Sequence, residues 1–260
     1  MLRIVGTVKL DTADRVKAML ASLDSMKPMA HLIESWHLNI AGKMCYGAQE
    51  EIAYRWENVH ITTDSERAPY QLIQNQIEGT NPNSLLLFWQ EDHWFVCPHV
   101  AMWEYVLDAF EKSKATYLQA SHLRTAWKRK PRTQKSNVLY QELLVDAESQ
   151  RQIWQRYPKA SVLGIPAVFK RSLLEHIIDS RQAALWQDLS PAGFEIPRSA
   201  GIEFLKHTDY TEMVPAFHVF REAHIKNWRL RCMDAQDALA WIKLRDAGSQ
   251  FGGSHDNFNE

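Results

Sequence analysis

The sequence predicts an α/β protein with a mostly parallel central sheet and helices on both faces of that sheet. Strand-like and helical segments alternate through the first half of the chain, which is the order that produces a parallel sheet. The run from Leu85 to Trp89 is apolar at every position, as in a strand whose two faces are both buried. The 260 residues, of which 45% are hydrophobic, are sufficient for one large domain or two small ones.

The elements of the first half follow from hydrophobic spacing and from turn residues. Arg3 to Leu10 predicts a first strand, and Asp11 or Thr12 is suited to cap the helix that follows. His31 to Ile40 alternates apolar and polar residues like a second strand. The other expected elements are a short helix at Glu50 to Trp56, a strand at Val59 to Thr63, a helix at Pro69 to Ile77, the strand at Leu85 to Trp89, a helix at Pro98 to Lys112 and a strand at Ala115 to Leu118.

The second half of the chain is less regular than the first. The expected elements are helices at Gln141 to Trp154, Arg171 to Arg181 and Asp234 to Arg245, and a strand at Ser161 to Phe169 that Gly164 and Pro166 interrupt. Residues 247–260 are polar and rich in glycine, which predicts a disordered tail.

Charge and cysteine content exclude several classes of protein. The formal net charge is −1, so no overall electrostatic attraction to nucleic acid or to an anionic membrane is expected. The basic cluster from Lys128 to Arg132 is local and predicts a solvated loop, or alternatively a surface that docks phosphates or an anionic acceptor. The three cysteines are widely spaced and match neither a disulfide framework nor a zinc site. With no signal-peptide pattern and no apolar run of about 20 residues, a soluble cytoplasmic protein is expected.

The acidic pair Glu91-Asp92 and His93 come directly after the apolar run. Ligands of open α/β sheets gather at the carboxyl ends of such strands. A carboxylate pair at that position can hold a divalent cation through oxygen ligands, or it can serve acid–base chemistry. The alternative is that the pair only ends a strand in a polar turn.

Three segments in this order resemble the GT-A glycosyltransferases, the nucleotide-sugar-dependent family, and in particular its family-2-like members. The first is Ile4 to Leu23, a strand followed by a helix. The second is Leu72 to Trp94, in which a helix, a glycine turn and an apolar strand lead to acidic residues. The third is Gly164 to Leu174, which is similar to the segment of the family where a strand passes into a helix on the acceptor side. The acidic motif diverges, because Gln90-Glu91-Asp92-His93 replaces the usual Asp-x-Asp.

The resemblance implies a single GT-A-like domain at 1–246, with a nucleotide-binding half at 1–120 and an acceptor-side half at 121–246. It implies a hexosyltransferase-like enzyme that moves a sugar from a nucleotide-sugar donor to a glycan or glycoconjugate acceptor, in the synthesis of a surface polysaccharide. Peripheral association with a membrane is left open, and no nucleic-acid partner is expected. The alternatives are a non-catalytic carbohydrate- or nucleotide-binding protein with the same fold, and a nucleotidyl- or phosphoryltransferase. Phosphate-loop and dinucleotide enzymes are disfavoured, because the chain has neither glycine motif.

Such a transfer requires that the charge of the diphosphate leaving group be offset by a cation or by Lys and Arg. The resemblance implies Mn²⁺ or Mg²⁺ at Asp92, with Glu91 or His93 helping. For His93 the alternative is a structural, hydrogen-bonded histidine.

The resemblance places the base and ribose of the donor at Thr7, Val8 and Lys9. Asp64, directly after a predicted strand, is a second candidate, and its alternative role is to cap a turn that leads to Pro69.

The remaining candidates lie in the acceptor-side half. In an inverting enzyme a carboxylate takes the proton of the acceptor hydroxyl, and Glu203 and Glu195 are the candidates for this role. Either glutamate is alternatively a first-turn acid that complements a helix dipole. The resemblance implies that Arg221, His224 or Arg229 lies near the diphosphate. The alternative is that these residues belong to an amphipathic helix with solvated charges.

Overall fold

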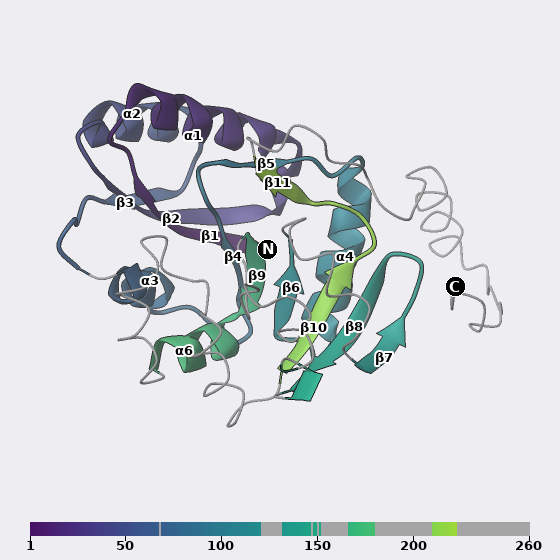
Figure 1. The fold of residues 1–260 in the computed structure, drawn as a ribbon. Coiled ribbons are helices and arrows are strands. Elements are labelled where there is room, and N and C mark those ends of the chain that lie inside the picture. Colours follow the sequence, from purple (N-terminus) through teal and green to yellow (C-terminus); the bar gives the residue numbers. More distant parts are fainter. Residues whose placement is uncertain are drawn as a thin grey trace.

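A mixed sheet with helices on both faces forms the framework of the molecule (Figure 1). The computed structural model describes residues 1–67, 69–120, 132–146, 148–149, 151, 166–179 and 210–222. Within these residues the main sheet has nine strands in the order β3-β2-β1-β4-β9-β6-β10-β8-β7, and β11 and β5 form a second, two-stranded sheet. The predicted α/β class with helices on both faces is therefore confirmed.

The parallel part of the sheet lies in the first half of the chain. Its strands are β1 (Leu2–Lys9), β2 (Ile33–Ala41), β3 (Val59–Thr62) and β4 (Leu85–Phe88). The chain steps outward from β1 to β2 and β3, and then returns to place β4 on the other side of β1. The direction of strand addition thus reverses between β1 and β4, which is where open α/β sheets bind their ligands.

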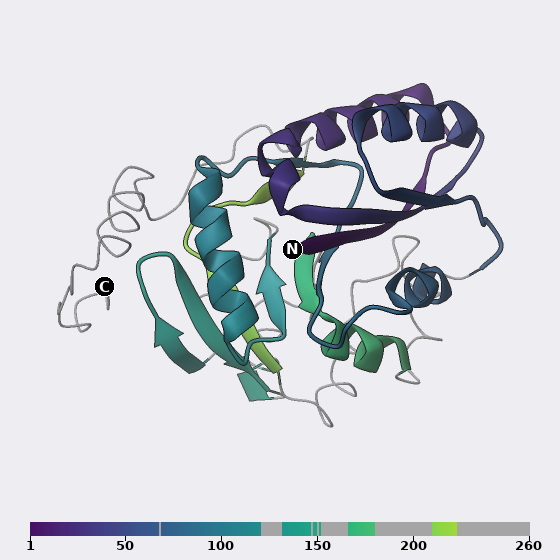
Figure 2. The same cartoon turned by 180° about the vertical axis from the view of Figure 1, so that it is seen from behind.

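The helices divide into two groups, one for each face of the sheet (Figures 1 and 2). The helices are α1 (Ala13–Ser25), α2 (Cys45–Arg55), α3 (Pro69–Ile77), α4 (Val100–Lys112) and α6 (Arg171–Asp179), with a short 3-10 helix η1 (Lys27–Leu32) after α1. Side chains of α1, α2 and α4 share one buried apolar cluster, whereas those of α3 and α6 belong to another. As predicted, α1 is capped, since the Thr12 hydroxyl accepts a hydrogen bond from the Arg15 N–H at 3.4 Å.

The second half of the chain completes the sheet largely with antiparallel strands. Strand β9 (Ala167–Lys170) lies antiparallel between β4 and β6 (Tyr117–Gln119), and β10 (Tyr210–Pro215) is parallel to β6. The edge is formed by β8 (Tyr140–Val145) and β7 (Arg132–Ser136). Near α1, β5 (His93–Phe95) pairs with β11 (Phe220–Glu222).

Two predictions for this half are wrong. The helix expected at Gln141 to Trp154 begins instead as strand β8, because its buried side chains lie between β7 and β10 and that pairing overrides helical propensity. The amphipathic helix given as the alternative for Arg221, His224 and Arg229 is wrong for Arg221, which lies on strand β11, paired with β5. The predicted helix at Asp234 to Arg245 and the predicted tail at 247–260 lie outside the described residues. In the part of the chain that is described, no helix has the length and apolar character needed to cross a membrane.

Candidate functional site

The pairing of β1 with β4 ends at Val5 and Phe88, whereas β1 continues beside β2 to Lys9. We call residues 6–12 and 89–93 the switch point. The last hydrogen bond between the two strands runs from the Trp89 N–H to the Val5 carbonyl at 2.9 Å. Beyond it, the side-chain amide of Gln76 on α3 bonds to both the N–H and the carbonyl of Gly6, at 3.2 and 3.0 Å. A Cβ atom at residue 6 would lie 2.9 Å from the Trp89 carbonyl oxygen, so this close approach requires glycine.

The acidic pair is clamped to α1 from both sides. The Ser22 hydroxyl accepts a hydrogen bond from the indole N–H of Trp89 at 2.8 Å and donates one to the His93 carbonyl. The Ser25 hydroxyl accepts the Phe95 N–H at 2.8 Å. The chain is therefore held to one helix by the Trp89 side chain before the acidic pair and by the backbone of His93 and Phe95 after it.

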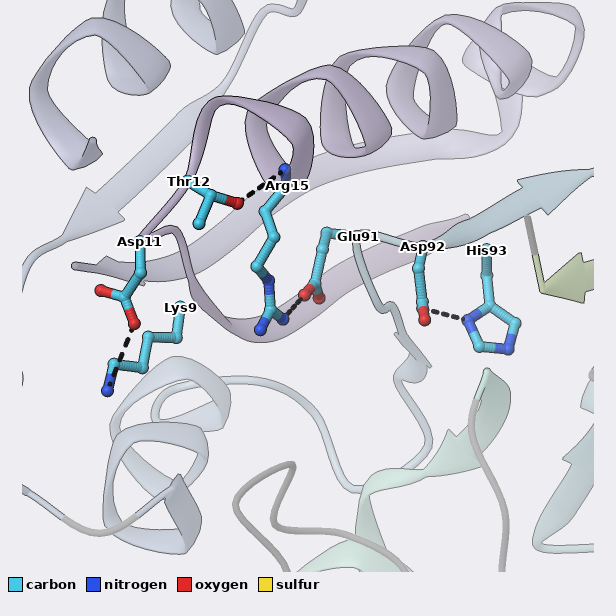
Figure 3. Close-up of polar contacts among 7 residues, drawn as sticks. All are labelled: Lys9, Asp11, Thr12, Arg15, Glu91, Asp92 and His93. Carbon is cyan, nitrogen blue, oxygen red and sulfur yellow. Dashed lines mark hydrogen bonds and ion pairs between the residues drawn. The ribbon is translucent and has the colours of Figure 1, made fainter. Parts of the chain in front are cut away.

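The two acids of the pair have different surroundings (Figure 3). The side chain of Glu91 is 10% exposed and forms an ion pair with Arg15 in the first turn of α1. The side chain of Asp92 is 44% exposed, and its Oδ1 lies 2.7 Å from Nδ1 of His93, whose side chain is 2% exposed. Glu91 thus has its charge offset within the protein, whereas Asp92 presents a carboxylate to solvent.

This arrangement restricts the predicted metal ligands. In the described ranges no group of three or more His, Cys, Asp or Glu side chains is placed to hold a metal ion. His93 directs Nδ1 at Asp92 and therefore orients that carboxylate, which is a common role of a residue behind a metal ligand. Magnesium is usually bound by one or two carboxylates together with phosphate oxygens of the substrate. Asp92 fits such a shared site, and Glu91 does not.

Basic side chains reach the same end of β1. Lys9 is exposed and lies 3.4 Å from the Asp11 carboxylate, and Arg15 is half-exposed. Figure 3 shows Lys9 at the end of β1 and Arg15 in the first turn of α1, and the dipole of the helix favours an anion at its start. Of the other residues predicted for the donor, Val8 is buried in the core, and the Thr7 hydroxyl is buried with no hydrogen-bond partner among the described residues.

Asp64 has the capping role that the sequence gave as an alternative. Its carboxylate caps the turn after β3 by accepting the N–H groups of Glu66 and Arg67 at 2.9 and 3.0 Å. These hydrogen bonds, first that of Arg67 and then that of Glu66, lower the pKa of Asp64. Asn39, which is fully buried, fixes the backbone here: its amide accepts the Asp64 N–H and the Thr62 hydroxyl, and it donates to the Asp64 carbonyl.

Asp64 also lines a cavity of about 240 Å³ between β2, β3 and α3. Polar residues of its wall include His37, His60, Arg67 and Gln76. Because Gln76 also bonds to Gly6, the cavity adjoins the switch point. The rings of His37 and His60 stack with centroids 4.6 Å apart, and burial, with smaller contributions from Arg3 and His60, lowers the pKa of His37 to about 4.

Arg221 lies near the acidic pair, on strand β11. It is paired with Trp94 across the two-stranded sheet, and its guanidinium lies 5.2 Å from the centroid of that indole ring. Trp94 is two residues from Asp92 in the chain. The four other predicted site residues, Glu195, Glu203, His224 and Arg229, lie outside the described residues, and their roles stay predictions.

Several residues of this region were not predicted from the sequence, among them Arg15, Asn39 and Gln76. A cation three residues after a helix cap is a weak signal for Arg15. Nothing in the sequence marks the amides, because Gln76 meets Gly6 across 70 positions and Asn39 meets Asp64 across 25.

No protein-family model matches the chain, and a search of curated proteins finds no match. Solved structures do match. A structure of S. aureus TarS has a TM-score of 0.51 at 9% identity over 85% of this chain and 36% of that one. A structure of its residues 1–349 has 0.48 at 10% over 85% and 60%. The galactosyltransferase LgtC, in complex with donor and acceptor sugar analogs, has 0.44 at 10% over 98% of each chain.

This chain thus spans less than two thirds of either TarS chain. At 9% identity and a TM-score of 0.51, the likeness shows the fold alone. The chain has the GT-A fold, as the resemblance implied.

Proposed function

We propose that this protein is a glycosyltransferase that moves a sugar from a nucleotide-sugar donor to a glycan or glycoconjugate acceptor. The observation that carries the proposal is the switch point, where Lys9 and Arg15 follow from β1 and the exposed carboxylate of Asp92 follows from β4. Ligands of open α/β sheets bind at this position. The GT-A fold supports the same class of reaction by analogy, since one fold can host several functions.

The diphosphate of the donor would lie at the start of α1. The unpaired N–H groups of a helix N-terminus and its dipole favour phosphate, and Lys9 and Arg15 add positive charge there. Asp92 would hold Mn²⁺ or Mg²⁺ together with phosphate oxygens, and His93 would orient the carboxylate. The cation would supply charge neutralisation of the leaving group.

The base of the nucleotide would occupy the cavity that Asp64 and Arg67 line. A carboxylate accepts hydrogen bonds and a guanidinium donates them, so the pair suits the mixed donor and acceptor edge of a nucleobase. Glu203 or Glu195 would take the proton of the acceptor hydroxyl, with Arg221, His224 or Arg229 near the diphosphate. A role in surface polysaccharide synthesis in the cytoplasm, with peripheral membrane association, is part of the proposal.

A thermal-shift screen tests this function with UDP, GDP, CDP and CMP, each with Mn²⁺ and with EDTA. A ligand at about 100 times its dissociation constant stabilises the native state by about 2.7 kcal/mol, which raises the melting temperature by several degrees. We expect one nucleoside diphosphate to produce this shift. No shift with any nucleotide would contradict the proposal.

Asp92→Asn distinguishes a transferase from a non-catalytic binding protein. A nucleotide sugar that contains the stabilising nucleotide is incubated with the protein, and the release of the nucleoside diphosphate is measured. We expect turnover to fall at least about 100-fold while the nucleoside still binds, because the loss concerns charge that develops at the leaving group. Equal turnover in both proteins would show that Asp92 has no role in the reaction.

A further inference from the structure

The Glu91–Arg15 pair joins the strand side of the switch point to the helix side (Figure 3). Glu91 comes from the turn after β4 and Arg15 from the first turn of α1, 76 positions apart in the sequence. The carboxylate is nine-tenths buried, whereas the guanidinium is half-exposed. Burial already fixes the position of Glu91, and a buried charge requires a partner. The contact therefore mainly restricts the position of Arg15.

Arg15 keeps hydrogen-bonding capacity after it has paired with Glu91. A guanidinium carries five N–H donors in a fixed planar fork, and one of its terminal nitrogens contacts Glu91. Because the Arg15 side chain is half-exposed, its remaining donors are available to a ligand with several acceptor oxygens. Lys9 lies at the same end of β1, but its side chain is 71% exposed and its ion pair, among the described residues, is with the surface carboxylate of Asp11, so it is held less firmly.

We infer that the two acids of the motif have separate roles: Arg15 binds the diphosphate of the donor directly, and Glu91 is the residue that positions Arg15. Asp92 is then the one acid of the pair that meets the cation. The inference rests on the proposed function, because it assigns residues toward a nucleoside diphosphate. Its chemical basis is that a preorganised arginine recognises phosphate oxygens through its planar fork at a small entropic cost.

The first test measures, by titration calorimetry in EDTA, the affinity for the nucleoside diphosphate that stabilises the protein and for the matching nucleoside. Arg15→Gln should weaken diphosphate binding about 10- to 100-fold, the effect of losing a charge-assisted hydrogen bond, and leave nucleoside binding unchanged. Lys17→Gln is the matched control, because Lys17 is an exposed cation of the same helix, and we expect no change. Arg15→Lys keeps the charge without the fork and should give an intermediate loss.

The second test separates the two acids. Glu91→Gln should weaken the diphosphate about 3- to 10-fold without raising the Mn²⁺ concentration needed for half-maximal binding, whereas Asp92→Asn should raise that concentration. In Arg15→Gln/Glu91→Gln, the diphosphate affinity should fall no further than in Arg15→Gln, because Glu91 acts through Arg15.

The outcomes identify which statement fails. A Mn²⁺ requirement that rises equally in Glu91→Gln and Asp92→Asn would make Glu91 a cation ligand and overturn the inference. An unchanged ratio of diphosphate to nucleoside affinity in Arg15→Gln would also overturn it, while the proposed function would stand. If the unmodified protein binds no nucleotide, the proposed function fails first.

Discussion

The switch point and the residues around Asn39 both lie toward the carboxyl ends of the parallel strands, but their polar side chains are of different kinds. At the switch point the groups are charged, with a half-exposed Arg15 paired to a buried Glu91, and an exposed Lys9 near Asp11. Around Asn39 the groups are mostly neutral, and one fully buried amide makes three hydrogen bonds.

This difference indicates which part holds the fold and which part is free to act on a ligand. Satisfied neutral hydrogen bonds in a buried site contribute to stability and are costly to break. Half-exposed ion pairs contribute little to stability, but they present charge to a ligand. Substitutions around Asn39 should therefore act on the free energy of unfolding, and those at Lys9 on binding.

The largest effect on stability is expected for Asn39→Ala. The substitution leaves the Thr62 hydroxyl and the N–H and carbonyl of Asp64 without their partner. Unpaired polar groups cost about 1–3 kcal/mol each when buried, and less here, because Thr62 is exposed and Asp64 is partly exposed. We expect a loss of about 2–4 kcal/mol in urea unfolding. Asn83→Ala, at an exposed turn, is the control and should stay within about 0.5 kcal/mol. Equal losses of unfolding free energy in Asn39→Ala and Asn83→Ala would show that the hydrogen bonds of Asn39 do not hold the fold.

The next largest effect is expected for Gly6→Ala, which alters the separation of β1 from β4. The added methyl group would lie 2.9 Å from the Trp89 carbonyl oxygen, and the forced shift should cost about 1–3 kcal/mol. Gly47→Ala in α2 is the matched control, because nothing lies within 4 Å of its Cβ position, and it should be neutral or stabilising by up to about 1 kcal/mol. Unfolding in urea measures both. A Gly6→Ala protein as stable as the unmodified one would mean that the strands are not tightly apposed at Trp89.

The sequence predicts the first half of this molecule better than the second. The strands and helices of residues 1–120 follow from short-range patterns, such as the cap at Thr12 and the apolar run before Glu91, and most were predicted within a few residues. Strands β7 and β8, which form a local hairpin, were missed. Strands β10 and β11 were also missed, because their partners β6, β8 and β5 are distant in the sequence. Local propensity does not contain that information.

The acidic pair shows the same limit at the level of single residues. Its position at the end of a buried strand was predictable from the apolar run that precedes it. The division between a buried Glu91 and an exposed Asp92 depends on α1, which supplies Arg15 and Ser22 from about 70 positions earlier. Two adjacent carboxylates that look equivalent in the sequence therefore differ in the folded chain.

A smaller effect is expected for His37 as the pH changes. Its pKa is lowered to about 4 from the ordinary value of 6.5, chiefly by burial, so the unfolded chain binds a proton that the native protein excludes. Stability is then complete above about pH 6.5 and decreases as the pH falls from 6.5 through 4. Because His37 is only partly buried, we expect a contribution of about 1 kcal/mol. Thermal unfolding from pH 7.5 to 4.5 should fall less steeply in His37→Gln, and parallel curves would contradict the assignment.

The smallest effect on stability is expected for Lys9→Gln at the switch point. Its contact with Asp11 at 3.4 Å is between exposed side chains, and such pairs contribute about 0–1 kcal/mol. The unfolding free energy should therefore change by less than about 0.5 kcal/mol, while affinity for a nucleoside diphosphate falls about 3- to 10-fold at low salt and less at high salt, because screening weakens exposed charges. Titration at two ionic strengths checks this. A loss of stability without a loss of affinity would place Lys9 with the residues that hold the fold, and the contrast with Asn39 would then apply to Arg15 alone.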